Sequence, residues 1–333
     1  FENITGRAPS GKMLAIGSVL YGATASGGAV DAGTIFKVNS DGSAFTLLHQ
    51  FDGTNGRIPN ELIAVGSTLY GTTAEGGAGG VGLIFRMDLD GSNFSVIYEF
   101  NTADGATPSG RLYSTGTSLF GTTMQGGVSG FGVVYRTSLD GSGFARLHQF
   151  NSADGETPNG SLIQVGSSLY GTTQAGGAHG KGVIFSLNTD ASAFTVHHEF
   201  NTTDGETPVA GLLAIGSTVY GTTSTGGSST DGVLFSIQSD GTGFSVLHEF
   251  NRASGGMPMG TLIASSSALY GTTARGGTSD IGTLYKINLD GTGKTVLHHF
   301  DADTGQGPES GVIALGSSLY GSTSHGSTTG YGL

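Results

Sequence analysis

The sequence contains no cysteine and no tryptophan, and its 13 basic residues form no cluster. Without cysteine, the chain has no disulfides, no thiolate metal sites and no cysteine catalysis. Charged residues make up 11% of the chain, where roughly 25% is usual for a soluble domain. The formal net charge of −12 provides no positive surface for a phosphate backbone or for anionic lipid. We therefore expect no binding to nucleic acid or to a membrane surface.

Long apolar runs are missing as well. No stretch approaches the roughly 20 residues of a membrane-spanning helix, so we expect no membrane insertion. The chain starts at Phe1 and shows no signal-like segment. We therefore expect a soluble protein that has been processed or is a fragment.

Glycine is abundant, with 62 residues in a chain of 333, far above the usual share of about 7%. Such a composition can indicate disorder. Against this, 36% of the residues are hydrophobic, and 18 Phe and 11 Tyr recur at regular positions. Each repeat thus carries enough apolar surface to offset the entropy lost on ordering. We expect the glycines to mark turns in an ordered fold.

A short element, an apolar residue followed by an aromatic and a glycine, recurs with a fixed period. Its aromatic residues are Tyr21, Tyr70, Phe120, Tyr170, Tyr220, Tyr270 and Tyr320. The first spacing is 49 residues and the other five are 50. A fixed period of this size indicates one supersecondary unit per repeat, which must pack against its neighbours. We interpret residues 1–333 as a single domain of seven repeats of about 50 residues, the last one truncated, with these aromatics filling the space between units.

One repeat, residues 159–208, illustrates the pattern. Four short runs have strand composition and are bounded by glycine or, between the last two, by Asp190-Ala191, which is Asp-Gly in the other complete copies. The runs are residues 161–165, 168–173, 183–187 and 194–200. A polar connection, residues 201–208, leads to the next repeat.

Four short antiparallel strands per repeat predict an all-β fold, a seven-bladed β-propeller of four-stranded antiparallel blades. A β-helix is the competing fold, but its coils need fewer residues and lack three hairpin turns each. The seventh blade is incomplete, because residues 331–333 align only with the start of the third strand. An open strand edge of this kind invites pairing with another strand.

The repeats also resemble known groups. Tyr70, Gly76-Gly77, Phe85, Asp90-Gly91 and Phe94 are similar to the pattern of kelch repeats. More closely, Gly-Ser-x-Leu-Tyr-Gly-Thr-Thr-x-x-Gly-Gly, followed by Gly-x-Ile-Phe and Asp-Gly-Ser-x-Phe, resembles the GloVer tandem repeats of bacterial surface proteins. This resemblance covers essentially the whole chain. It implies an exported, often surface-anchored protein without an assigned chemistry.

One position near the end of each repeat carries a histidine in most copies. These residues are His49, His148, His198, His248 and His298, with Tyr98 in the remaining copy. A ring of packed sheets would hold them more than about 10 Å apart, too far for a shared metal. We interpret them as half-buried, hydrogen-bonded structural residues.

Acidic residues cluster in the connections between repeats, and Asp301, Asp303 and Glu309 are the best candidates for calcium ligands. Calcium takes about six to eight oxygens, and the loops lack the dense alternating acid pattern of a strong site. Asx turns and capping explain these residues without a metal. We predict no metal and no cofactor.

Catalysis needs a unique group of residues, and the repetition argues against one. The Asp-Gly-Ser-x-Phe turns differ in spacing from the Asp box of sialidase propellers, and no arginine triad accompanies them. Irregular positions such as Pro59-Asn60-Glu61 and Lys294 are interpreted as drift at exposed sites. We predict that the protein is not an enzyme and has no catalytic residues.

The sequence therefore predicts a non-catalytic structural or adhesive module, extracellular or at the cell surface. We expect it to self-associate into oligomers or fibres through the incomplete blade. The alternative is a lectin-like propeller with repeated sites between blades, whose partner is a glycan or surface polymer. The lack of tryptophan weakens this alternative, although tyrosine can also stack on a sugar.

Overall fold

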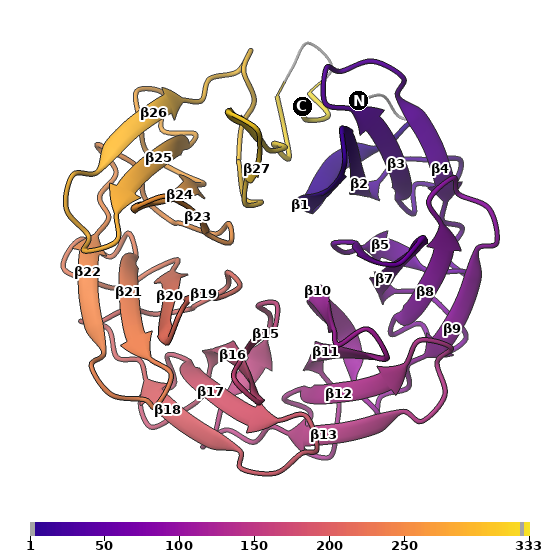
Figure 1. The fold of residues 1–333 in the computed structure, drawn as a ribbon, viewed down its shortest axis with the longest axis horizontal. Coiled ribbons are helices and arrows are strands. Elements are labelled where there is room, and N and C mark those ends of the chain that lie inside the picture. The colour runs from indigo at the N-terminus through magenta and orange to yellow at the C-terminus, as the bar shows by residue number, and fades with distance from the viewer. Residues whose placement is uncertain (1–3, 327–329) are drawn as a thin grey trace.

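A computed structural model describes residues 4–326 and 330–333. In it the chain forms a ring of narrow, radial β-sheets around a central axis (Figure 1). The two ends of the chain lie side by side where the ring closes (Figure 1). None of the described residues belongs to a helix that is long and apolar enough to cross a membrane.

Six sheets are complete blades. The first three contain β1 (Arg7–Ile16), β2 (Val19–Ser26), β3 (Thr34–Asn39) and β4 (Thr46–Gln50); β5 (Arg57–Pro59), β6 (Ile63–Val65), β7 (Thr68–Glu75), β8 (Leu83–Asp88) and β9 (Ser95–Glu99); and β10 (Ala106–Ser114), β11 (Ser118–Gln125), β12 (Val133–Ser138) and β13 (Ala145–Gln149).

The next three complete blades follow in chain order. They contain β14 (Glu156–Pro158), β15 (Ile163–Val165), β16 (Ser168–Ala175), β17 (Val183–Asn188) and β18 (Thr195–Glu199); β19 (Leu213–Ile215), β20 (Thr218–Thr223), β21 (Val233–Gln238) and β22 (Ser245–Glu249); and β23 (Ile263–Ser265), β24 (Ala268–Thr273), β25 (Thr283–Asn288) and β26 (Thr295–His299).

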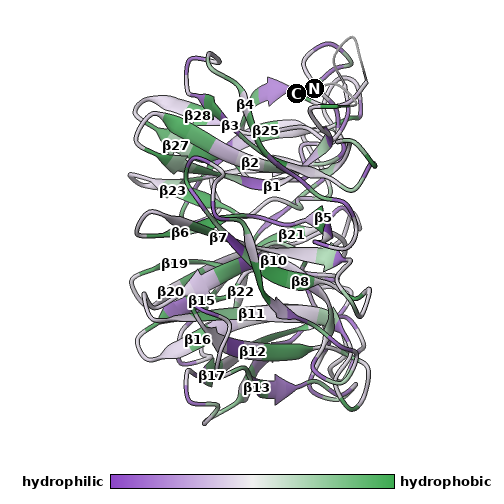
Figure 2. Ribbon diagram, turned by 90° about the vertical axis from the view of Figure 1, so that its right-hand side faces the viewer, coloured by the Kyte–Doolittle hydropathy of each residue, from purple (hydrophilic) through white to green (hydrophobic). Residues whose placement is uncertain are grey.

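Each blade is a meander of antiparallel strands whose first strand lines the axis and whose fourth lies at the rim (Figure 1). Edge-on, connecting loops lie on both sides of the strands, and the rim strands β4 and β13 end in hydrophilic residues (Figure 2). The first strand is interrupted in two blades, where β5 and β6 both pair with β7, and β14 and β15 both pair with β16. β1, β5, β10 and β14 begin two residues before the proline, so part of the connection that was expected to be irregular is strand in these blades. β19 and β23 begin after the proline, and the connection predicted at residues 201–208 contains only an isolated bridge, from Glu206 to Thr225.

Among the described residues, the seventh sheet contains two strands, β27 (Ile313–Leu315) and β28 (Ser318–Tyr320). The start of a third strand is present, because Leu333 N–H donates to Thr323 Oγ1 at 3.2 Å, as Val183 N–H does to Thr173 Oγ1 at 3.2 Å. The described chain is therefore a propeller with six complete four-stranded blades. A complete seventh four-stranded blade is not seen.

The hydrophobic core lies between blades. Tyr170 of the fourth blade is 6% exposed and packs in one cluster with Phe200, Leu212 and Phe235. Leu212 and Phe235 belong to the fifth blade. The aromatics of the first five repeats pack in this way against the next blade, so these neighbours bury each other's apolar faces. Tyr270 and Tyr320 are only half-buried.

In the six complete blades, an aromatic ring of the third strand lies over the glycine that follows the repeat aromatic and leaves no room for a Cβ. A Cβ at Gly171 would come within 2.6 Å of Phe185 Cζ. The equivalent glycines of all six complete blades would place a Cβ 2.4 to 2.6 Å from the ring or hydroxyl of a Phe or Tyr on the third strand. Gly321, in the two-stranded sheet, has no such ring, and its nearest contact would be Val312 Cγ1 at 3.1 Å.

We predict that Gly171→Ala destabilises the protein by about 1 to 3 kcal/mol, because a methyl group there overpacks the core. The matched variant Gly321→Ala should change the free energy of unfolding by less than about 0.5 kcal/mol, as substitutions away from packed positions do. Urea denaturation of both variants measures this. Equal losses of stability would contradict the role assigned to the ring.

A clasp at each proline joins the blades. The residue before the proline donates its N–H to a carbonyl of the preceding blade, as Thr157 does to Phe131 at 3.0 Å. Its φ is positive, +57° for Thr157, which is unusual for a β-branched residue. The proline ring packs on a glycine of the preceding blade, because a Cβ at Gly132 would lie 2.7 Å from Pro158 Cδ. The same clasp joins the two ends of the chain, where Ala8 N–H donates to Tyr331 O at 3.0 Å.

Candidate functional site

Two features depart from the repeat, and both are surfaces to which another molecule has access. The first is an apolar face left uncovered beside the two-stranded sheet, and the second is a group of charged residues in the central channel. We call the first the open face, formed by Tyr270, Leu284, Leu297, Phe300 and Leu319. We call the second the channel triad.

Apart from Leu297, whose equivalents are half-buried, the open face consists of positions that are buried in the other blades. Leu297 is 45% exposed, and Leu284 and Phe300 are only half-buried. The residues equivalent to Phe300 are at most 1% exposed, and those equivalent to Leu284 are fully buried. These equivalents are Phe51, Phe100, Phe150, Phe200 and Phe250, and Ile35, Ile84, Val134, Ile184 and Leu234.

The cause is the short seventh sheet. In a complete blade, the third and fourth strands cover the preceding blade, and the turn between them lies against the rim of that blade. In the sixth blade, for example, a Cβ at Gly291 in this turn would lie 2.1 Å from Leu247 O in the fifth blade. Leu297, the next copy of Leu247, has no described turn against it. Leu319 and Tyr320 on β28 are likewise half-buried, whereas Leu169 is fully buried.

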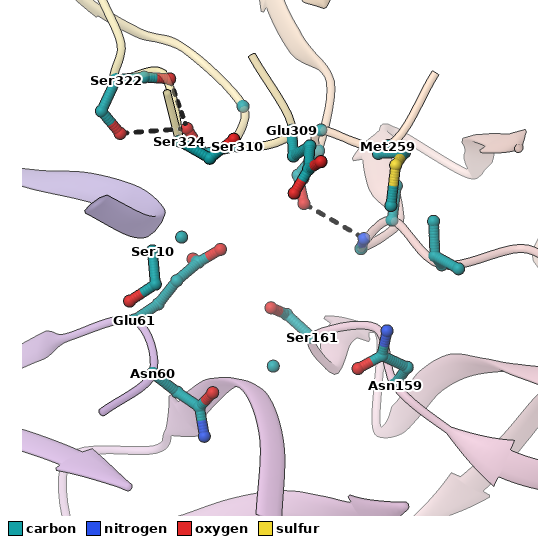
Figure 3. A pocket seen from close by; sticks show the side chains of 18 of the residues that line it. Ser10, Asn60, Glu61, Asn159, Ser161, Met259, Glu309, Ser310, Ser322 and Ser324 are labelled. Carbon is teal, nitrogen blue, oxygen red and sulfur yellow. Dashed lines mark hydrogen bonds between the residues drawn. The ribbon is translucent and has the colours of Figure 1, made fainter. Parts of the chain in front are cut away.

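The central channel contains two adjoining cavities of about 420 and 530 Å³. Both volumes lie within the range of about 300 to 1,000 Å³ typical of small-molecule sites. The first is lined by hydroxyl and amide side chains from several blades, including Ser10, Asn60 and Asn159 (Figure 3). The second is lined largely by aliphatic residues.

The channel triad consists of Lys12, Glu61 and Arg111, which lie in three successive blades. Glu61 lines both cavities, and its side chain points into the channel (Figure 3). Its Cγ packs over Gly11, where a Cβ would come within 2.2 Å. Lys12 and Arg111 line the second cavity. Ser161 fixes the backbone beside Arg111, because its Oγ accepts the Arg111 N–H at 2.8 Å.

The triad is electrostatically perturbed. Burial raises the pKa of the Glu61 carboxyl, while the Lys12 N–H and the charges of Arg111 and Lys12 oppose this shift. Burial lowers the pKa of Lys12, with Glu61 opposing and Arg111 adding to the shift. Such shifts indicate that the channel solvates charge poorly.

The sequence interpretation missed this group. It treated Glu61 as drift at an exposed position, because Pro59-Asn60-Glu61 lacks the glycine of Pro108-Ser109-Gly110. Aligning the repeats on the apolar residue that follows, which is leucine in five copies, Met13 in the first and Val312 in the last, reveals the signal. The residues before that apolar position are Lys12, Glu61, Arg111, Ser161, Gly211, Thr261 and Gly311.

The repeated histidines lie between blades and away from the channel. The His148 ring stacks on Phe194 of the next blade at 3.5 Å, and His148 Nε2 lies 3.2 Å from Asp154 Oδ2. Tyr98 occupies the same place, stacking on Phe144 at 4.0 Å and donating its hydroxyl to Asp104 Oδ2 at 2.7 Å. The position serves packing between blades, which accounts for the exchange of histidine and tyrosine.

Burial lowers the pKa of His49, His148, His198 and His248 below the ordinary value of 6.5. The unfolded chain therefore takes up protons more readily than the folded protein. The stability from the neutral rings is complete above pH 6.5, and it is lost as the pH falls below 6.5 toward the lower pKa of the folded state.

We predict that the free energy of unfolding decreases between pH 7.5 and pH 5, and that the double variant His148→Tyr, His198→Tyr shows a shallower decrease. Tyrosine keeps the stacking and hydrogen bond seen at Tyr98 but does not titrate in this range. Urea denaturation across the pH series measures the slope. An unchanged slope would show that these histidines do not cause it.

The calcium candidates do not converge on one site. Asp301 Oδ1 accepts bonds from the Asp303 and Thr304 N–H groups and from the Thr304 hydroxyl, an Asx-type turn. Glu309 lies elsewhere, at the channel (Figure 3). Within residues 4–326 and 330–333, no group of three or more metal-ligating side chains is found.

We predict that stability does not depend on calcium. The melting temperature should be the same in excess EDTA and in millimolar calcium. A fall in EDTA that is reversed by calcium would contradict this, since a ligand at 100 times its Kd stabilises by about 2.7 kcal/mol.

Comparison with solved structures supports the propeller fold. The extracellular domain of BT4673 from B. thetaiotaomicron superposes with a TM-score of 0.64 at 15% identity, over 98% of this chain and 39% of that one. A prolyl endopeptidase superposes with a TM-score of 0.57 at 9% identity, over 93% of this chain and 45% of that one. The tricorn protease superposes with a TM-score of 0.51 at 13% identity, over 89% of this chain and 26% of that one. At these identities the likeness shows the fold alone, and the chain spans less than half of each of these proteins.

The chain is thus an all-β propeller built of tandem repeats. It belongs to the Gloeobacter/Verrucomicrobia repeat family, whose pattern matches residues 1–168 and 213–333. No curated protein matches the sequence. The GloVer resemblance is confirmed by this match, while the likeness to kelch repeats stays a sequence prediction.

Proposed function

We propose that this chain is a non-catalytic structural or adhesive module, extracellular or at the cell surface, that assembles by accepting β-strands at the seventh sheet. The observation behind the proposal is the open face. Tyr270, Leu284, Phe300 and Leu319 are half-buried, whereas their equivalents in the complete blades before them are buried; Leu297 is exposed, whereas its equivalents are half-buried.

The exposed edge of β28 favours an added strand that continues the register set by Leu333. Leu333 N–H donates to Thr323 Oγ1, so the first residue of the third-strand position is already in register. An incoming segment that continues this register would pair with β28 and cover Leu297 and Phe300. The segment that fits has the alternation of the repeat's own third and fourth strands, as in residues 184–200. Its backbone pairing would supply the affinity, and its apolar side chains the specificity.

Tandem repetition supports the non-catalytic part of the proposal. Most acidic residues belong to repeated turns, as Asp140 does when its Oδ1 accepts the Ser142 N–H at 2.9 Å. The histidines are engaged between blades. Surface localisation is proposed from the resemblance to bacterial surface proteins. Glycan binding at repeated sites between blades stays a prediction from the sequence.

We predict that a synthetic peptide of residues 184–200 binds the protein and raises its melting temperature, because it fills the two missing strand positions. The matched control is the same peptide with Phe185 and Val196 changed to proline, which cannot donate ladder hydrogen bonds. Isothermal titration calorimetry measures binding. Sedimentation velocity should show concentration-dependent association that the peptide suppresses.

Two results together would refute this assembly. One is a failure of the peptide to bind at millimolar concentration. The other is a strictly monomeric protein across the concentration series. Peptide binding by a monomer would support the strand-accepting edge and refute self-association.

A further inference from the structure

The central channel carries charge on one side only. One channel-lining position recurs in every repeat, immediately before the apolar residue found at Met13, Leu62 or Leu112. It is charged in the first three blades, at Lys12, Glu61 and Arg111. In the other four repeats it is small and neutral, Ser161, Gly211, Thr261 and Gly311. These positions all lie at the channel. The charged side is therefore a single, unrepeated group inside a repeated scaffold, as a binding site requires.

The two cations of the triad share a single carboxylate, that of Glu61, so the protein neutralises only one of the two positive charges. None of the ion pairs within 4.0 Å in the described part of the chain joins Lys12, Glu61 or Arg111 to any partner. Arg111 Nε is buried and has no hydrogen-bond partner among the described residues. Lys12 and Arg111 are half-buried, and partial removal of an unpaired charge from water is unfavourable, so an anion between Lys12 and Arg111 would stabilise both. With Glu61 ionised, the triad keeps a net charge of +1, matched by one monoanion.

The remaining lining adds hydrogen-bonding groups to this anion site. Asn60 Nδ2 donates to Thr72 Oγ1 at 3.0 Å and to Pro108 O at 2.8 Å, which leaves its carbonyl oxygen as an acceptor. Ser10, Asn159 and Glu61 also line the first cavity (Figure 3). Glu61 is a strong acceptor for hydroxyl donors. This set fits a ligand that carries several hydroxyl groups next to its anionic group.

We propose that the central channel binds a small polyhydroxylated carboxylate, of the uronic acid class. Its carboxylate lies between Lys12 and Arg111, and its hydroxyl groups bond to Glu61 and the amide and hydroxyl side chains of the first cavity. This site is separate from the strand-accepting edge of the seventh sheet, so either proposal can fail without the other.

The test is calorimetric titration at low salt with glucuronate, glucose and benzoate. Glucose has the hydroxyls without the charge, and benzoate has the carboxylate without the hydroxyls. We expect glucuronate to bind at least ten times more tightly than glucose or benzoate. Its affinity should decrease as sodium chloride is added, because salt screens the charges. Arg111→Ser and Lys12→Ser should each weaken glucuronate binding at least tenfold.

These variants are designed to fold. Serine occurs at the same channel position in the fourth repeat, at Ser161, so the melting temperature should stay near that of the parent. Arg111→Lys should retain part of the affinity, and Arg86→Ser, which removes the same charge from β8, should leave binding unchanged. Absence of glucuronate binding, equal binding of glucose or benzoate, or equal loss in Arg86→Ser would each overturn the proposal.

Discussion

The clasp between successive blades is the interaction on which the rest of the structure depends. It joins a backbone N–H to a carbonyl at 2.8 to 3.3 Å, and it occurs seven times. The donors are Ala8, Ile58, Thr107, Thr157, Thr207, Met257 and Gly307, and all have φ between +48° and +62°. The following proline ring packs on a glycine where a Cβ would lie 2.5 to 2.9 Å from Cδ. Because the clasp recurs with a left-handed backbone, the packing of adjacent blades must stabilise a conformation that is unfavourable in isolation.

The clasp explains why a ring forms around a two-stranded sheet. Closure uses the innermost part of each blade, and this part is present in all seven repeats. Gly332 packs against Pro9 as Gly182 packs against Pro208. The rim is a separate layer, and its absence from the seventh sheet exposes apolar residues without opening the ring at the axis. The same separation lets the channel positions vary in charge, since the strand framework behind them is fixed by backbone bonds.

The sequence predicted the repeat, the four strands of each blade and the propeller, because strand composition and turn residues are local and recur in every copy. It predicted the equivalence of His148 and Tyr98 for the same reason. It did not predict that β1, β5, β10 and β14 begin two residues before the proline, because a left-handed residue such as Thr157 is stabilised only by the neighbouring blade. The channel triad was missed because Lys12, Glu61 and Arg111 are about 50 residues apart, and only ring closure brings such residues to one axis.

Hydrogen exchange of the Ala8 amide tests the closed ring most directly. Ala8 N–H donates to Tyr331 O across the junction of the two ends, as Thr157 N–H donates to Phe131 O within the chain. A closed ring predicts that the Ala8 amide is protected from exchange well above an unstructured amide, approaching the protection of Thr157. Exchange of Ala8 at the rate of an unstructured amide, with Thr157 protected, would show that the ring is open and contradict this account.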